Sequence, residues 1–206
     1  MTGEQLSTDR EQPVNASLAK LMREDFERYT CLRYLEGASR LRKCVAAVRQ
    51  RGLRTIWYFR LRRAALGLHP LLKIPCIPLW FTAKLLLRPS SSCEIPQETD
   101  IGGGCFLPHP IGIVVASHCH IGSGANIFSG VVLGINHLST NRGAPVLGDH
   151  VTLYAGAKVI GEVTLGNHVV VGANAVVNTD VAPYTVVAGV PARQIAVLEQ
   201  GTEIPF

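Results

Sequence analysis

The chain has 206 residues, of which 47% are hydrophobic and 17% are charged, and its formal net charge is +5. This composition supplies enough apolar residues for a sizeable core and excludes an intrinsically disordered chain. The length fits one domain or two small ones.

The N-terminus, MTGEQLSTDREQ, is polar and lacks the basic-then-apolar pattern of a secretory signal. The six cysteines show neither a CxxC pair nor a regular metal-ligand spacing, so we expect free thiols in a reducing cytoplasm. They are Cys31, Cys44, Cys76, Cys93, Cys105 and Cys119.

Residues 1–92 are predicted to be helical. A first helix follows a cap at Asn15 or Ser17 and ends at Gly37. A second is expected over 39–51 and a third over 53–66. The third combines aromatic with basic residues and stops at a glycine.

Basic residues are concentrated between positions 33 and 88, where only Glu36 opposes them. Such a block predicts an anionic partner: phospholipid, a diphosphate-linked substrate or nucleic acid. The second half of the chain carries few basic residues, so it does not resemble a nucleic-acid groove, and no nucleic-acid partner is expected. The basic residues are Arg33, Arg40, Arg42, Lys43, Arg49, Arg51, Arg54, Arg60, Arg62, Arg63, Lys73, Lys84 and Arg88.

The segment 69–87 is apolar, but its prolines and lysines deny it a smooth transmembrane span. One interpretation packs it on the rest of the molecule or across a subunit interface. The other places it at a membrane surface, with Trp80 and Phe81 in lipid and basic residues at the headgroups. Packing is the favoured interpretation, because apolar stretches this short usually belong to a core.

After a hinge at 88–92, an aliphatic residue recurs every six positions through most of residues 93–206. Six is neither the period of a helix nor that of a strand; it is typical of a parallel β-helix, in which short strands stack coil on coil. The aliphatic residue of each repeat is predicted to point into the axis. The thirteen positions are Ile95, Ile101, Leu107, Ile113, Ile121, Ile127, Leu133, Leu147, Leu153, Val159, Leu165, Val171 and Val177.

Two longer steps interrupt this rhythm, from Ile113 to Ile121 and from Leu133 to Leu147. The second contains the polar segment GINHLSTNRGAP and predicts a loop that projects from the coils. Loops on rigid scaffolds often carry function.

Histidines invite a metal hypothesis. His118 and His120 are expected to share one face of a strand, with His150 and His168 near coil corners. A zinc site needs three or four converging ligands, and the spacing typical of γ-class carbonic anhydrases is not evident here. Solvated or capping histidines are therefore favoured, and no metal is expected.

Four segments resemble the hexapeptide-repeat acyltransferases, in particular their serine acetyltransferase and polysaccharide O-acetyltransferase branch. They are PHPIGIVV at 108–115, VVLG at 131–134, RGAPVLGDHV at 142–151 and AGVPARQI at 188–195. The resemblance covers roughly the last 115 residues. It implies a left-handed parallel β-helix preceded by helices, and transfer of acetyl from acetyl-CoA to a hydroxyl.

The resemblance makes His109 the general base, because an alcohol needs its proton removed as the new bond forms. The family supports this histidine with an aspartate fifteen residues earlier, and that position here is Glu94. With about eighteen residues per coil, Glu94 is expected nearly beneath His109, one strand spacing of roughly 4.8 Å away. Its carboxylate would orient the imidazole.

The resemblance also implies that acetyl-CoA lies in the groove between adjacent prisms of a homotrimer, or of a dimer of trimers. An N–H near Gly134 would stabilise the oxyanion. The residues expected to contact the cofactor are Gly134, Ala155, Gly156, Lys158, Ala173 and Arg193.

The acceptor site departs from the serine acetyltransferase pattern. Pro108 stands where those enzymes have an aspartate, and the segment 141–145 retains Arg142 but lacks the family's second histidine. A free amino acid needs charged partners at both ends. A saccharide hydroxyl is therefore preferred over L-serine, with Asn136, His137 and Arg142 as expected acceptor contacts.

Three alternatives stay open: a serine O-acetyltransferase of cysteine biosynthesis, a non-catalytic solenoid scaffold and, more distantly, a metal-dependent carbonic anhydrase. The expected location is the cytoplasm, with peripheral contact to the inner face of the membrane through the basic N-terminal half.

Overall fold

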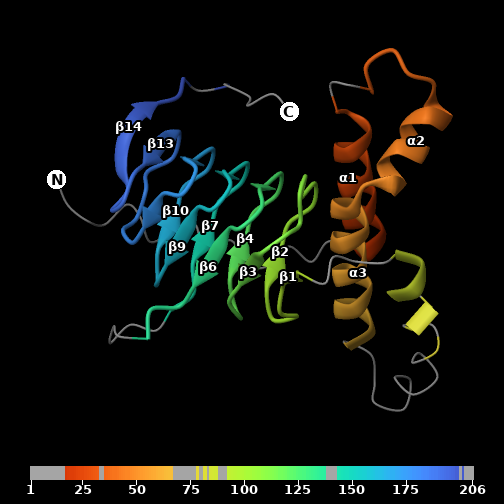
Figure 1. Ribbon diagram of the computed structural model, residues 1–206, viewed down its shortest axis with the longest axis horizontal. Helices are drawn as coiled ribbons and strands as arrows, with labels where there is room; N and C mark the ends of the chain where they lie inside the picture. The colour runs from red at the N-terminus through yellow and green to blue at the C-terminus, as the bar shows by residue number, and fades with distance from the viewer. Residues whose placement is uncertain are drawn as a thin grey trace.

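The computed structural model describes residues 17–32, 35–66, 78, 81–82, 84–87, 92–137, 143–199 and 201. Helices cover one end of a solenoid of parallel strands (Figure 1). The hinge at 88–91, Trp80 and most of the apolar segment 69–80 lie outside the described residues. None of the described helices has the length and apolar character needed to cross a membrane.

Three helices form the helical cap, which is the name used below for residues 17–66. They are α1 (Leu18–Thr30), α2 (Arg40–Arg49) and α3 (Arg51–Leu66). The hydroxyls of Ser17 and Ser39 cap α1 and α2 by accepting from the N–H groups of Lys20 and Arg42.

The first helix is shorter than predicted, because it ends at Thr30 and not at Gly37. The chain leaves the helix there and buries Leu32 and Leu35 in the core. Gly37, with φ +74°, belongs to the turn that follows.

In the part of the chain that the structure describes, fourteen short strands form three sheets, and each full coil contributes one strand to each sheet. All pairings are parallel except that of β13 with β14. Sheet 1 contains β1 (Cys93–Glu94), β3 (Ile113–Val115), β6 (Val132–Gly134), β9 (Lys158–Ile160) and β12 (Val176–Val177). Sheet 2 contains β2 (Asp100–Ile101), β4 (His120–Ile121), β7 (Val146–Leu147) and β10 (Thr164–Leu165). Sheet 3 contains β5 (Asn126–Ile127), β8 (Thr152–Leu153), β11 (Val170–Val171), β13 (Thr185–Ala188) and β14 (Arg193–Val197).

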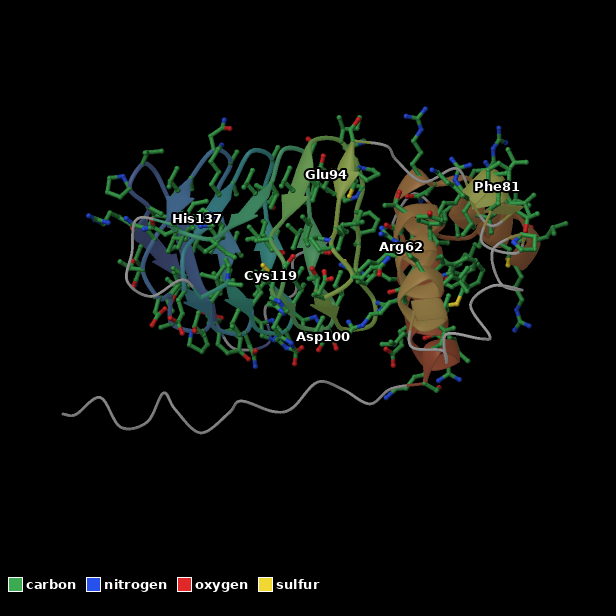
Figure 2. The ribbon with its side chains drawn as sticks, turned by 90° about the horizontal axis from the view of Figure 1, so that it is seen from below. Arg62, Phe81, Glu94, Asp100, Cys119 and His137 are labelled. Atoms are coloured by element: carbon green, nitrogen blue, oxygen red, sulfur yellow. The ribbon has the colours of Figure 1, made fainter. Side chains whose placement is uncertain are left out.

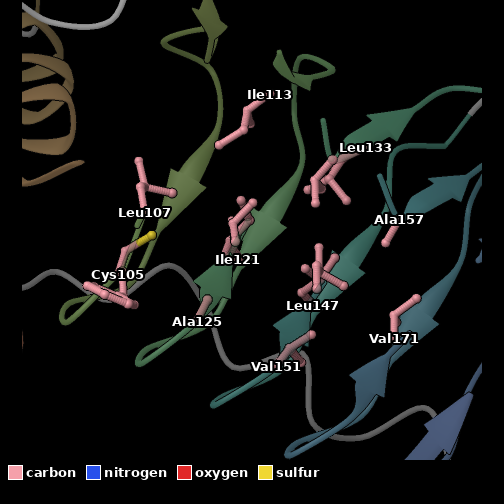
Figure 3. Packing of buried hydrophobic residues seen from close by; sticks show 14 of the residues in the cluster. Cys105, Leu107, Ile113, Ile121, Ala125, Leu133, Leu147, Val151, Ala157 and Val171 are labelled. Carbon is pink, nitrogen blue, oxygen red and sulfur yellow. The ribbon is translucent and has the colours of Figure 1, made fainter. Parts of the chain in front are cut away.

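The six-residue repeat is confirmed as the core of the solenoid. Twelve of the thirteen aliphatic residues are buried, and the thirteenth, Ile95, is partly buried and packs against them. Successive coils stack these side chains along the axis (Figure 3). The parallel β-helix is therefore observed, while its left-handed sense stays a prediction.

A buried ion pair between α1 and α3 of the helical cap is also hydrogen-bonded to the backbone of the first coil. The guanidinium of Arg60 donates to both carboxylate oxygens of Asp25, at 2.6 and 3.0 Å, and to the carbonyls of Ile101 and Gly102. Burial raises the pKa of Asp25, and the interaction with Arg60 opposes that rise. Arg60 therefore has an internal partner, which corrects its assignment to a block that meets an external anion.

Other basic residues of the block are used in the same way. Arg63 donates to the carbonyl of Thr99 and to Asp100 at 2.9 Å. Arg62 lies at the joint between α3 and the first coil, against Gln97 (Figure 2). The helices and the solenoid share one hydrophobic core, so position 92/93 marks a change of architecture, and its role as a domain boundary stays a prediction.

Candidate active site

His109 lies on an exposed turn at the corner where sheet 3 leads into sheet 1. We call the stacked turns 107–112, 128–131, 154–157 and 172–175 the His109 corner. Backbone bonds join successive turns: Gly130 N–H to Ile111, Gly156 N–H to Ser129, and Asn174 N–H to Ala155. The corner is therefore one continuous ridge of the solenoid.

The turn that carries His109 is longer than the turns above it. Phe106 pairs with Asn126, and Val114 pairs with Val132, so this turn holds two more residues than its neighbour. The extra residues fall in the Leu107–Pro110 stretch, where the side chain of His109 is exposed. Such an exposed imidazole on a rigid turn has the access that a general base needs.

The helical cap supports this turn from below, which the sequence did not predict. The hydroxyl of Tyr29, a fully buried residue of α1, accepts from the N–H of Leu107 at 2.8 Å. Gly52 of α3 lies so close to the carbonyl of Leu107 that a Cβ there would collide with it. Two helices thus fix the backbone two residues before His109.

Glu94 lies near the His109 corner but not in the predicted position. The strand register puts Val114, not His109, opposite Glu94 in the coil above. Val114 is five residues beyond His109, and the two extra residues of the long turn account for two of these five positions. Glu94 is exposed on the outer face of sheet 1, at the top of the view in Figure 2.

Most of the expected cofactor contacts gather on the His109 corner. Ala155, Gly156 and Ala173 occupy neighbouring turns, and the ammonium of Lys158 donates to the carbonyl of Gly156 at 2.9 Å. Gly156 has φ +74°, a conformation that favours glycine. A ligand can approach the backbone closely here, since no side chain at these three positions is larger than a methyl group.

Arg193 begins β14, after a turn that closes this corner at the last coil. The N–H of Ala192 bonds to Val176, and the N–H of Val176 bonds to Gly189. The side chain of Arg193 is exposed. Its guanidinium donates to the carbonyl of Ala192 at 2.9 Å and remains accessible to an anion at the end of the ridge.

The remaining predicted residues lie at the opposite edge of sheet 1. Gly134 ends β6, and Asn136 and His137 follow it, with His137 exposed (Figure 2). From Gly130 to Gly134 the chain crosses sheet 1, a distance of about 13 Å for four extended residues. Within one chain these residues are therefore separated from His109. Arg142 falls outside the described residues.

The other histidines serve different purposes. His118 lies in a turn with φ 64°, and not on the strand with His120 as predicted. His120 instead contacts Asp100 at 3.2 Å. His150 and His168 stack at 4.9 Å, and His168 stacks on Tyr184. Among the described residues, no three His, Cys, Asp or Glu side chains are grouped to hold a metal ion.

The described cysteines are free thiols, as expected. Burial raises the pKa of Cys93 and Cys105 to about 12 and that of Cys119 to about 11. These three thiols are therefore protonated at neutral pH and are poor nucleophiles.

Comparisons with known proteins relate this geometry to a family. The model of bacterial transferase hexapeptide repeats matches residues 144–179. The serine acetyltransferase of Bacillus subtilis is 31% identical over 156 residues, which cover 74% of this chain and 67% of that protein. The chain belongs to the serine acetyltransferase family.

Other members of the family agree with this assignment. The Staphylococcus xylosus enzyme is 39% identical over 100 residues, 48% of this chain; the match spans about half of that enzyme, 46% of its length. A solved serine acetyltransferase from Brucella abortus has the same fold, with a TM-score of 0.68, 24% identity, and coverage of 88% of this chain and 70% of that one. A serine acetyltransferase solved in complex with CoA is 27% identical, with a TM-score of 0.66 and coverage of 88% and 71%.

Proposed function

We propose that the protein is an acetyl-CoA-dependent O-acetyltransferase in which His109 is the general base. The observation that carries this proposal is the His109 corner. One ridge presents an exposed imidazole, a series of methyl-sized side chains suited to a long thin cofactor, and basic groups at Lys158 and Arg193. The serine acetyltransferase relatives support the same chemistry.

In the proposed reaction, His109 accepts the proton of the acceptor hydroxyl while the oxygen of that hydroxyl attacks the thioester carbon of acetyl-CoA. Collapse of the tetrahedral intermediate breaks the carbon–sulfur bond, and the imidazolium returns the proton to the thiolate of CoA. Glu94 is proposed to stabilise the imidazolium. Because the register places Glu94 opposite Val114, its carboxylate would reach the imidazole from the strand side of the corner.

The site is proposed to form between subunits of a homotrimer, with a dimer of trimers as the larger assembly. The predicted residues lie on two edges of sheet 1, separated within one chain by about 13 Å. If neighbouring solenoids pack side by side, the His109 corner of one subunit faces the other edge of the next. Gly134, Asn136, His137 and Arg142 would then meet His109 across the groove.

L-serine is the acceptor that the relatives favour, which reverses the order in which sequence analysis ranked serine and saccharide. All the relatives described above are serine acetyltransferases, and they give no support to the polysaccharide branch. One observation keeps a saccharide hydroxyl as the second candidate: Pro108 lacks the charge that the family's aspartate offers to an amino acid.

Release of CoA thiol from acetyl-CoA tests the proposal, with L-serine and a set of sugars as acceptors. His109→Ala should lower kcat by about 10²- to 10⁴-fold while CoA binding is retained. Glu94→Gln should lower kcat less, and Glu98→Gln, a nearby exposed carboxylate, is the matched control. Equal activity of wild type and His109→Ala would remove His109 from the role of general base, whereas no thiol release by the wild type with any acceptor would leave a non-catalytic scaffold as the remaining function.

A further inference from the structure

The helical end of the molecule exposes apolar side chains of α2 and of residues 81–87 on the side of α3 that faces away from the solenoid. Leu41, Val45 and Val48 of α2 are 76%, 49% and 47% exposed. Phe81, Leu85 and Leu86, from the helical residues 81–82 and 84–87, are exposed at 65% or more. Figure 1 places this second segment and α2 at the helical end of the molecule, and Figure 2 places Phe81 there. We call these six residues the apolar face.

The orientation of α2 is the reverse of that of its neighbours. Tyr29 of α1 and Leu53 and Ile56 of α3 bury their apolar side chains completely. The buried residue of α2 is Ala47, while Leu41, Val45 and Val48, spaced i, i+4 and i+7, form a stripe that faces solvent. A stripe of this kind normally contacts a partner.

The charges beside the stripe identify the chemistry of that partner. Arg40, Arg42 and Arg49 are exposed and lie on either side of the apolar residues of α2. The helix RLRKCVAAVR contains no acidic residue. Lys84, exposed beside Leu85, adds a further positive charge. An apolar stripe with basic borders is the pattern of a helix that lies in the interface of an anionic membrane.

A second copy of the chain fits this surface less well. A twofold contact places the same patch of each copy against the other, so the basic borders of the two α2 helices would face each other without intervening acids. Nucleic acid would use the charges but leave the apolar stripe in water. We propose that the apolar face and the arginines of α2 dock the protein on an anionic lipid bilayer. This inference does not depend on the catalytic proposal.

Sedimentation of the full chain with lipid vesicles tests it. Vesicles containing one quarter phosphatidylglycerol should bind the protein at least tenfold more strongly than pure phosphatidylcholine, and salt at about 0.5 M should weaken this binding. The double variant Leu41→Ser/Val45→Ser should abolish binding to the anionic vesicles. Ile195→Ser/Val197→Ser, which changes two equally exposed apolar residues of β14, should not.

The charges are tested by a second matched pair. Arg42→Gln/Arg49→Gln should lower the partition coefficient on anionic vesicles by about 20-fold. Lys20→Gln/Arg23→Gln removes the same charge from α1, where both residues pair with glutamates, and should have a much smaller effect. Circular dichroism confirms that each variant is folded.

Two results would overturn the proposal. One is equal binding of the wild type to neutral and anionic vesicles, or none to either. The other concerns Leu41→Ser/Val45→Ser. If light scattering shows that this variant has a lower oligomeric mass than the wild type, and its binding to vesicles is unchanged, the apolar face is a contact between copies of the chain.

Discussion

The solenoid and the helical cap bury comparable kinds of side chain, but they hold them in different ways. In the solenoid the same contact recurs in every coil, with one aliphatic residue above the next and one backbone bond above the next. The cap is fixed to the first coil by a few individual polar contacts, chiefly those of the Asp25–Arg60 pair with the backbone of Ile101, Gly102 and Cys105, and that of Tyr29 with Leu107. When one contact in the solenoid is lost, equivalent contacts in the neighbouring coils remain. When a contact in the joint, where the helical cap meets the first coil, is lost, no equivalent contact replaces it.

The largest effect on stability is expected at the buried ion pair. Asp25→Asn leaves the guanidinium of Arg60 buried without a counter-charge and should lower the free energy of unfolding by about 3–5 kcal/mol. Chemical denaturation measures this loss. The control is Glu27→Gln, which breaks an exposed pair with Arg23 and should cost less than about 0.5 kcal/mol. A similar loss in both variants would show that the joint does not depend on this pair.

In the solenoid, the expected effect is slightly smaller and independent of position. Leu153→Ala and Leu165→Ala each remove a fully buried side chain, and each should cost about 2–5 kcal/mol because a cavity remains. The two losses should agree within about 1 kcal/mol, since equivalent sites in a repeat make equivalent contacts. A large difference, measured by the same denaturation experiment, would argue against uniform coils.

The regularity of the solenoid is also the reason that the sequence predicted it. Burial of one residue in six imposes a period that can be read directly, and Ile101, Leu133 and Leu153 all lie where that period puts them. The cap helices were predicted for the same kind of reason: Ser17, one of the two expected caps, does cap α1, and Ser39, the expected start of the second helix, caps α2.

The joint was not predictable in this way, because its partners are far apart in sequence and no period marks them. Arg60 looked like one more member of a basic block, yet it is buried against Asp25. Glu94 was placed by counting residues per coil, but the register sets it opposite Val114, five residues beyond His109, and the longer His109 turn accounts for two of these five positions. Local irregularities of this kind decide where a site residue points.

Tyr29→Phe tests whether the joint matters for the candidate site. The variant leaves the N–H of Leu107 without its acceptor, which should cost about 1–3 kcal/mol. If the contact positions His109, kcat should also fall with KM for acetyl-CoA little changed. Tyr184→Phe, which lies outside the His109 corner and keeps the stacking on His168, is the control. Loss of stability with unchanged kcat would limit Tyr29 to a structural role.

The smallest effect is expected at the partly exposed cluster beside the joint. The hydrogen bond with His120 lowers the pKa of Asp100, and the nearby charge of Arg63 contributes. A carboxylate with a lowered folded pKa stabilises the fold above its unfolded pKa of about 3.9, and this contribution disappears as the pH falls below that value.

Asp100→Asn should therefore cost less than about 1 kcal/mol at pH 7, because solvent screens the pair. The difference between variant and wild type should vanish in acid. Thermal unfolding from neutral to acidic pH measures it. A difference that persists at a pH below the lowered folded pKa would assign it to lost packing instead.

The direction of the bonds at the joint has a consequence for assembly. The N–H groups of Asp100 and Gly102 already bond to the second coil. Arg60 and Arg63 engage the carbonyls of Thr99, Ile101 and Gly102, and Tyr29 engages the N–H of Leu107. These are backbone groups of the outermost coil that would otherwise offer an open edge for strand addition by another chain. By occupying them, α1 and α3 protect the solenoid from end-to-end aggregation.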